Sequence, residues 1–146
     1  MRYLMIVKAT PQSESGQFPP EAATMFAEMA AFNNEMIEAG VMLDAAGLKP
    51  SSAGKRVRFE GRGKTIVTDG PFAETKELIA GYWVIQCKDM GEALSWARRV
   101  PFHEGEVELR PFHEPEDIQG LASDEVIAQE QAWRDKQTRN APKTPA

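Results

Sequence analysis

The segment at 77–88, ELIAGYWVIQCK, constrains the fold more than any other part of the chain. Side chains alternate between the two faces of a strand. Tyr82 and Val84 therefore share one face, while Trp83 and Ile85 share the other. Both faces are largely apolar, and a strand of this kind has to be covered on both sides. The segment is the strongest strand signal in the chain, and it predicts a strand whose two faces are both buried.

A second strand with two apolar faces is predicted at 2–8, where Leu4 and Ile6 oppose Tyr3 and Met5. Helices can cover only one face of the sheet to which these strands belong. The remaining face needs another apolar surface, and a second copy of the same sheet supplies one. We therefore expect a homodimer in which two sheets pack face to face.

The whole pattern predicts an α+β fold of the ferredoxin-like, split βαβ type. Strands are expected at 2–8, 41–49, 55–61, 65–70, 77–88 and 105–112. Helices are expected at 21–40 and 89–101. The first helix carries an apolar stripe at helical spacing, formed by Met25, Met29, Phe32 and Met36. The connection GRGK joins two of the short strands into a β-hairpin that is inserted into the basic plan.

The chain divides into a folded domain at 1–114 and a polar, acidic tail at 115–146. A helix is predicted at 123–139, because Ser123 suits the N-cap and basic residues near the end suit the negative pole of a helix. We expect this helix to dock on the domain or on the other subunit. The last residues, 141–146, are expected to be disordered.

Composition argues against several classes of protein. A net charge of -5 over 146 residues argues against binding to nucleic-acid phosphates. A single cysteine, Cys87, leaves no internal disulfide and no cysteine zinc site. No apolar run could cross a membrane, and the N-terminal one is too short for a signal peptide, so we expect a cytoplasmic protein. His103 and His113 lack metal-ligand spacing and no nucleotide-binding motif is present, so neither metal nor cofactor is predicted.

Several separated motifs together resemble one family. They are Asp69-Gly70-Pro71-Phe72, then Glu74, Lys76, Glu77 and Gly81, the earlier Gly47-Leu48-Lys49-Pro50, and the ending EGEVELRPFHE. Over residues 1–114 the chain resembles the DGPF-domain branch of the YCII-related family. The resemblance implies a bacterial protein that forms a dimeric α+β barrel, in a family of largely unassigned function. Some relatives are encoded near, or fused to, sigma factors of the extracytoplasmic-function type.

The chain departs from the wider family at one position of the first helix. Members of the wider family typically have a His on the first helix and an Asp nearby, which together have been taken as an acid/base dyad. The position of that His falls on Met29 in this chain. Because a thioether cannot shuttle a proton, the dyad mechanism is not transferred to this protein.

The Asp-Gly-Pro-Phe turn supplies the main candidate site. In the functional interpretation Asp69 is an acid or base in a cleft, and Glu74 and Lys76 tune it, because clustered carboxylates beside a lysine can separate their pKa values. In the structural interpretation Asp69 caps the turn, Gly70 supplies a positive φ and Phe72 plugs the core. The candidate ligand cleft comprises Asn33, Gly70, Pro71, Phe72, Glu74, Lys76 and Glu77.

Two further residues complete the list of candidates. Asn33 lies beside the apolar stripe, where it either lines a cleft or finds a hydrogen-bond partner in the fold. His103 is a weak catalytic candidate, as the only imidazole near a helix end that could face the cleft.

Two functions follow from these candidates. One is a cofactor-free enzyme that binds or transforms a small aromatic or carbonyl-bearing molecule. The other is a non-catalytic binding or regulatory dimer, with a sigma-factor-type transcription protein as partner.

Overall fold

A computed structural model describes residues 1–140 of the chain, and the expectation for residues 141–146 lies outside that range. The helices and strands in chain order are β1 (Arg2–Lys8), α1 (Pro11–Glu14), α2 (Ala22–Glu38), β2 (Met42–Gly47), β3 (Lys55–Phe59), β4 (Thr65–Asp69), β5 (Ile79–Gln86), α3 (Met90–Ala97), β6 (Val107–Pro111) and α4 (Asp124–Asn140). Short 3-10 turns, η1 to η3, lie at Ser51–Ala53, Thr75–Glu77 and Pro115–Ile118.

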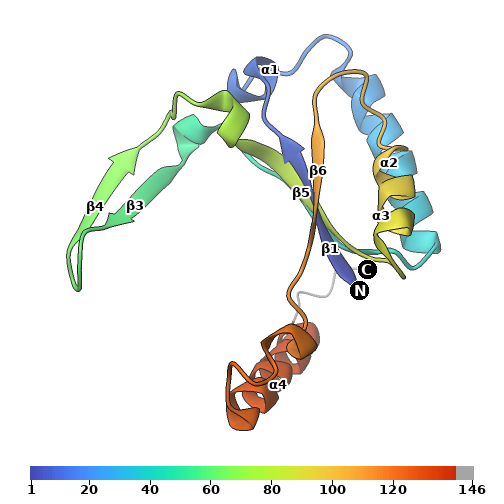
Figure 1. The fold of residues 1–146 in the computed structure, drawn as a ribbon. Coiled ribbons are helices and arrows are strands. Elements are labelled where there is room, and N and C mark those ends of the chain that lie inside the picture. Colours follow the sequence, from blue (N-terminus) through green and yellow to red (C-terminus); the bar gives the residue numbers. More distant parts are fainter. Residues whose placement is uncertain (141–146) are drawn as a thin grey trace. The chain divides into compact units, whose positions relative to one another are not determined.

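Four antiparallel strands form the main sheet in the order β2-β5-β1-β6 (Figure 1). This order, with α2 and α3 as the crossover helices, is the ferredoxin-like arrangement, and it confirms the predicted fold class. The strand β5, which the sequence predicted as a strand, lies in the interior of the sheet between β2 and β1. The strands β3 and β4 pair only with each other and form the inserted hairpin.

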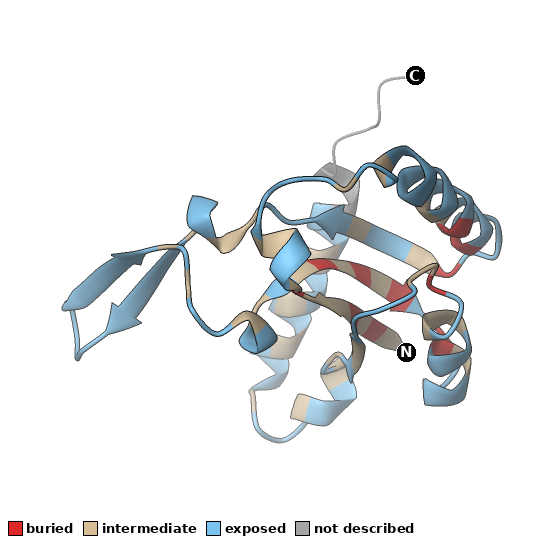
Figure 2. Ribbon diagram, turned by 90° about the horizontal axis from the view of Figure 1, so that it is seen from above, coloured by how far each residue is buried: buried red, intermediate tan, exposed pale blue. Residues whose placement is uncertain are grey.

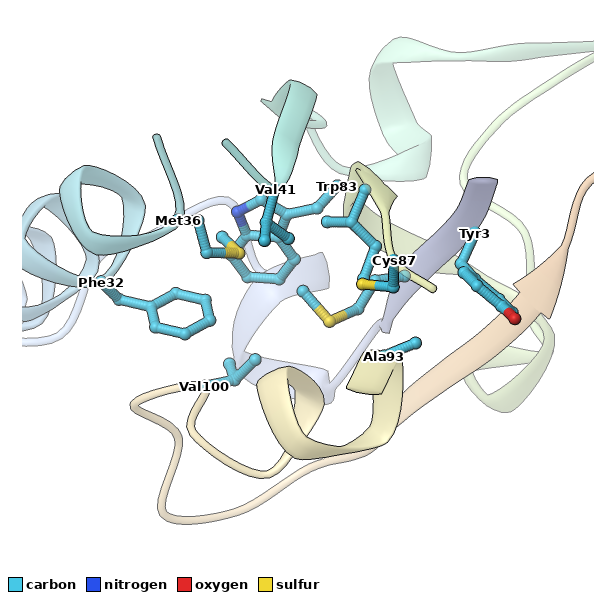
Figure 3. Close-up of a cluster of buried hydrophobic side chains, with 10 residues drawn as sticks. Tyr3, Phe32, Met36, Val41, Trp83, Cys87, Ala93 and Val100 are labelled. Carbon is cyan, nitrogen blue, oxygen red and sulfur yellow. The ribbon is translucent and has the colours of Figure 1, made fainter. Parts of the chain in front are cut away.

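The core lies between the helices and one face of the sheet (Figure 2). Tyr3 and Met5 of β1 lie opposite Ile85 and Trp83 of β5, and all four side chains are buried. Figure 3 shows the helix residues that meet this face of the sheet. The residues buried with them are Phe32, Met36, Val41, Cys87, Ala93 and Val100.

The helix α2 buries less of its predicted stripe than expected. Phe32 and Met36 are buried and Met29 packs against the core, but Met25 is 49% exposed. The stripe prediction is wrong at Met25, because the core contacts of the stripe begin at Met29. The helix ends where predicted, since Gly40 follows it with a φ of 69°, a conformation that glycine adopts without strain.

The second face of the main sheet carries no helix within residues 1–112. Leu4 and Ile6 of β1 lie opposite Val84 and Tyr82 of β5 on this face, and all four are half-buried. We call this surface, formed by Leu4, Ile6, Tyr82 and Val84, the open face. The alternation predicted for both strands is confirmed, whereas the predicted second copy on this face stays a prediction.

The chain separates into two compact units, Met1–Phe112 and His113–Ala146. Within the second unit, Ser123 caps α4 by accepting a hydrogen bond from the Val126 amide at 3.3 Å. Arg134 of α4 pairs with Glu130 at 2.5 Å and with Glu114 at 3.6 Å. Among the helices of residues 1–140, none has the length and apolar character that a membrane span requires.

Candidate functional site

The Asp-Gly-Pro-Phe turn is held against the η1 segment by its own backbone. The Gly70 amide donates to the Gly54 carbonyl at 3.0 Å, and a cis peptide bond joins Gly70 to Pro71. A Cβ atom at Gly70 would lie 1.7 Å from the carbonyl oxygen of Ser51. Gly70 is not among the glycines with positive φ, so that part of the structural interpretation is wrong. The turn requires glycine because two backbone segments approach closely there.

Ser51 connects this turn to the short helix α1. Its hydroxyl accepts a hydrogen bond from the Phe72 amide at 3.1 Å and donates to Oε2 of Glu14 at 2.5 Å. Its amide donates to Oε1 of the same carboxylate at 3.0 Å. Neither Glu14 nor Ser51 could be identified from the sequence, because 37 residues separate them and neither belongs to a recognisable motif. These hydrogen bonds fix the position of the turn.

Asp69 is not used in holding the turn together. Its side chain is 74% exposed and forms an ion pair with Lys55, its partner in the register of β3 and β4. Across the part of the chain that the structure describes, its carboxylate accepts no hydrogen bond from the backbone of the turn. The expectation that Asp69 caps its own turn is therefore wrong. The hairpin register was the signal that could have identified Lys55.

Phe72 does not plug the core, contrary to the structural interpretation. It is half-buried and lies outside the core cluster. The guanidinium of Arg56 lies over its ring, 3.8 Å from the centroid, in a cation–π contact. Asp69 and Phe72 therefore lie beside two basic side chains of β3, Lys55 and Arg56, at the base of the hairpin.

The three charged residues that follow the turn do not join this arrangement. Glu74, Lys76 and Glu77 are exposed on or beside η2. Within residues 1–140, no ion pair or hydrogen bond links any of them to Asp69. The basic partner of Asp69 is Lys55, rather than Lys76 as predicted.

Asn33 has a partner within the fold. Its Oδ1 accepts a hydrogen bond from Nε1 of Trp83 at 2.8 Å. Trp83 also makes an edge-to-face contact with Phe32, with centroids 5.9 Å apart and planes at 90°. The amide therefore satisfies an indole N–H that would otherwise be buried without a partner.

His103 lies at a different place from the turn. It is exposed beyond the end of α3, where it lines a shallow hollow together with Arg98, Phe102 and Val107. Asp69 is not part of that hollow. The structure does not bring these two catalytic candidates together.

Two other groups have shifted acidities. The hydrogen bond from the Tyr82 hydroxyl to Oδ2 of Asp44, 3.1 Å long, raises the pKa of the phenol, since the carboxylate stabilises its neutral form. Burial raises the pKa of the Cys87 thiol, which agrees with the prediction that it is not reactive. In the described part of the chain, no cluster of three His, Cys, Asp or Glu residues could hold a metal ion.

The chain is thus a small α+β protein with a ferredoxin-like sheet and an inserted hairpin. A fixed turn at the base of the hairpin carries a carboxylate that faces solvent. The chain belongs to the YCII-related domain family, whose model matches residues 1–114. It is 39% identical over 88 residues to an uncharacterised protein of Rhizobium meliloti (strain 1021), a match that covers 58% of this chain and 70% of that protein.

A solved structure also aligns with the chain. It is the 5-chloro-2-hydroxyhydroquinone dehydrochlorinase from Burkholderia phenoliruptrix AC1100 in complex with 2,5-dihydroxybenzoquinone. The alignment covers 80% of this chain and 99% of the enzyme, with 13% identity and a TM-score of 0.39.

Proposed function

We propose that this chain, as a cytoplasmic member of the DGPF branch of its family, binds or transforms a small molecule by cofactor-free acid/base chemistry beside the Asp-Gly-Pro-Phe turn. Asp69 is the proton-transfer or ligand-anchoring group. One observation carries the proposal: the turn is fixed through Gly70 and Ser51, while the Asp69 carboxylate faces solvent. A fixed backbone positions such a group in advance of binding.

The surroundings of Asp69 suit a small polar or aromatic ligand. The ammonium group of Lys55 lies beside the carboxylate, and it can stabilise negative charge on a bound molecule. The stacked Arg56 and Phe72 offer a flat surface with a positive charge. An aromatic or carbonyl-bearing molecule can use both features, with Asp69 accepting a proton from an acidic O–H or C–H bond.

The proposal includes a homodimer. The open face presents apolar side chains that no helix of residues 1–112 covers. Two such faces can pack against each other about a two-fold axis, because a surface of this kind is complementary to its own copy. The dimer brings two sheets together and leaves the helices on the outside.

Ligand binding by single-residue variants tests the role of Asp69. A panel of hydroxybenzoates and 2-oxo acids is screened by saturation-transfer NMR, and each binder is titrated against wild type, Asp69→Asn and Lys55→Met. We expect the affinity for a binder to fall at least about tenfold in both variants, the scale of one lost charge-assisted contact. Asp117→Asn, a matched change at an exposed carboxylate of the second unit, serves as control. Unchanged affinity in Asp69→Asn would contradict the proposal.

A second function is favoured by the separate unit at His113–Ala146. In this alternative the chain is a non-catalytic regulatory dimer, and the C-terminal unit binds a sigma-factor-type protein. The test is capture of a purified sigma factor of the extracytoplasmic-function type by the full chain and by a chain ending at residue 114. Equal capture by both chains would contradict a role for the C-terminal unit.

A further inference from the structure

The inserted hairpin, residues 55–69, is an arm that extends from the main sheet (Figure 1). Every residue of β3 and β4 is exposed. A two-stranded hairpin that packs against nothing is at best marginally stable in water. The arm therefore needs a surface on which to pack.

One face of the arm is apolar beyond its base, where the Lys55–Asp69 ion pair lies on the same face. Val57 lies opposite Val67, and Phe59 lies opposite Thr65 on the same face. Val57 is 52% exposed, Val67 59% and Phe59 77%. A contiguous exposed apolar surface of this kind marks a site of protein interaction. We refer to Val57, Phe59 and Val67 as the arm face.

The charge of the arm points to the partner. Its basic residues are Lys55, Arg56, Arg58, Arg62 and Lys64, against only Glu60 and Asp69. The arm thus carries a net charge of +3 in a chain of -5, which leaves -8 on the rest of the chain. The arm and the rest of a second copy therefore carry net charges of opposite sign, which favours their association.

The arm also extends in the direction of the proposed partner. Figures 1 and 2 both show it leaving the main sheet on the side opposite α2 and α3, which is the side of the open face. Its base is held by contacts of Gly70 with Gly54 and Ser51. A copy that packs on the open face therefore lies beside a hairpin whose base is already fixed.

We propose that the arm of each protomer packs its arm face against the second copy in the face-to-face dimer, with Arg62 and Lys64 at the tip of the arm over acidic surface of that copy. The inference rests on the homodimer proposed above and adds the element that holds it together. Two-fold symmetry makes the contact reciprocal, so each dimer contains two such contacts.

Sedimentation equilibrium and hydrogen exchange on the full chain test this inference. Phe59→Ser removes the one aromatic side chain of the arm, and we expect the dimer dissociation constant to rise at least about tenfold. Phe26→Ser changes the same residue type on α2, where Phe26 is 58% exposed, and we expect no change. In wild type, amides of 55–69 gain protection from exchange as the protein concentration rises through the dimer range, and Phe59→Ser loses that gain. Circular dichroism verifies that both variants are folded.

The results that would overturn the homodimer differ from those that would overturn the arm contact alone. A wild type that stays monomeric at all concentrations would overturn the homodimer, and with it this inference. A dimeric wild type with the same dissociation constant in Phe59→Ser would overturn the arm contact alone. Protection of the arm that is already present in the monomer would show that its own chain covers it, and would also overturn the inference.

Discussion

At the scale of single residues, Tyr82 of the open face forms a polar pair with Asp44 of β2. The Tyr82 hydroxyl donates to Asp44, and the Ala45 amide donates to the other oxygen of the same carboxylate at 2.8 Å. A carboxylate held in this way favours the protonated phenol, so the pKa of Tyr82 is raised.

Asp44→Ala should therefore lower the pKa of Tyr82 toward the ordinary tyrosine value of about 10. Ultraviolet absorbance of the ionised phenol, followed from neutral to alkaline pH, measures the change, and Tyr82→Phe assigns the transition. Tyr3 is the internal reference, because burial is the main cause that raises its pKa and Asp44 is not among the causes. A Tyr82 transition at the same pH with and without Asp44 would show that the hydrogen bond is not formed in solution.

Asp69 shows what could be predicted about the site at this scale. The motif identified the residue, since an acidic group before a Gly-Pro turn is visible in the sequence. It did not identify Lys55, Ser51 or Glu14, because their contacts depend on how distant segments meet. The predicted neighbours Glu74 and Lys76 are close to Asp69 in the sequence, but no interaction joins them to it in the described structure.

At the scale of elements, the turn and η1 behave as one packed unit. Gly70→Ala would place a methyl group against the Ser51 carbonyl. The steric clash can be removed only if one of the two backbone segments moves. We expect a loss of roughly 1–3 kcal/mol in the free energy of unfolding, the range found for overpacking. Urea unfolding measures it.

Gly47→Ala is the matched control, because a Cβ atom there meets nothing within 4 Å and its φ is not positive. We expect the free energy of unfolding of that variant to be unchanged or up to about 1 kcal/mol higher, because alanine lowers the conformational entropy of the unfolded chain. Equal stability of the two variants would mean that the turn does not approach Ser51 closely in solution.

Most elements could be predicted because their signals are local. The period of two in β1 and β5 and the capping glycine after α2 lie within the segments that they define. The helix α1 was missed because its composition is typical of a loop, although the reciprocal hydrogen bonds of Thr10 and Ser13 cap it. The exposure of Met25 could not be predicted, since a stripe does not show how far a sheet extends beneath it.

At the scale of the whole molecule, two apolar surfaces of residues 1–112 carry no helix (Figure 1). They are the open face and the arm face, and they lie on the same side of the main sheet (Figure 1). The apolar pattern of 2–8 and 77–88 indicated the first from sequence. The exposure of the arm face could be seen only in the structure, because a period of two in a hairpin does not show whether either face is covered.

We propose that Asp69 holds a small molecule beside the turn. Native mass spectrometry of wild type and Asp69→Asn, expressed and purified identically under mild conditions, tests it most directly. We expect a bound small molecule of defined mass on wild type and its loss from the variant, with the folded charge-state distribution unchanged. The same molecule at the same occupancy on both proteins would contradict it.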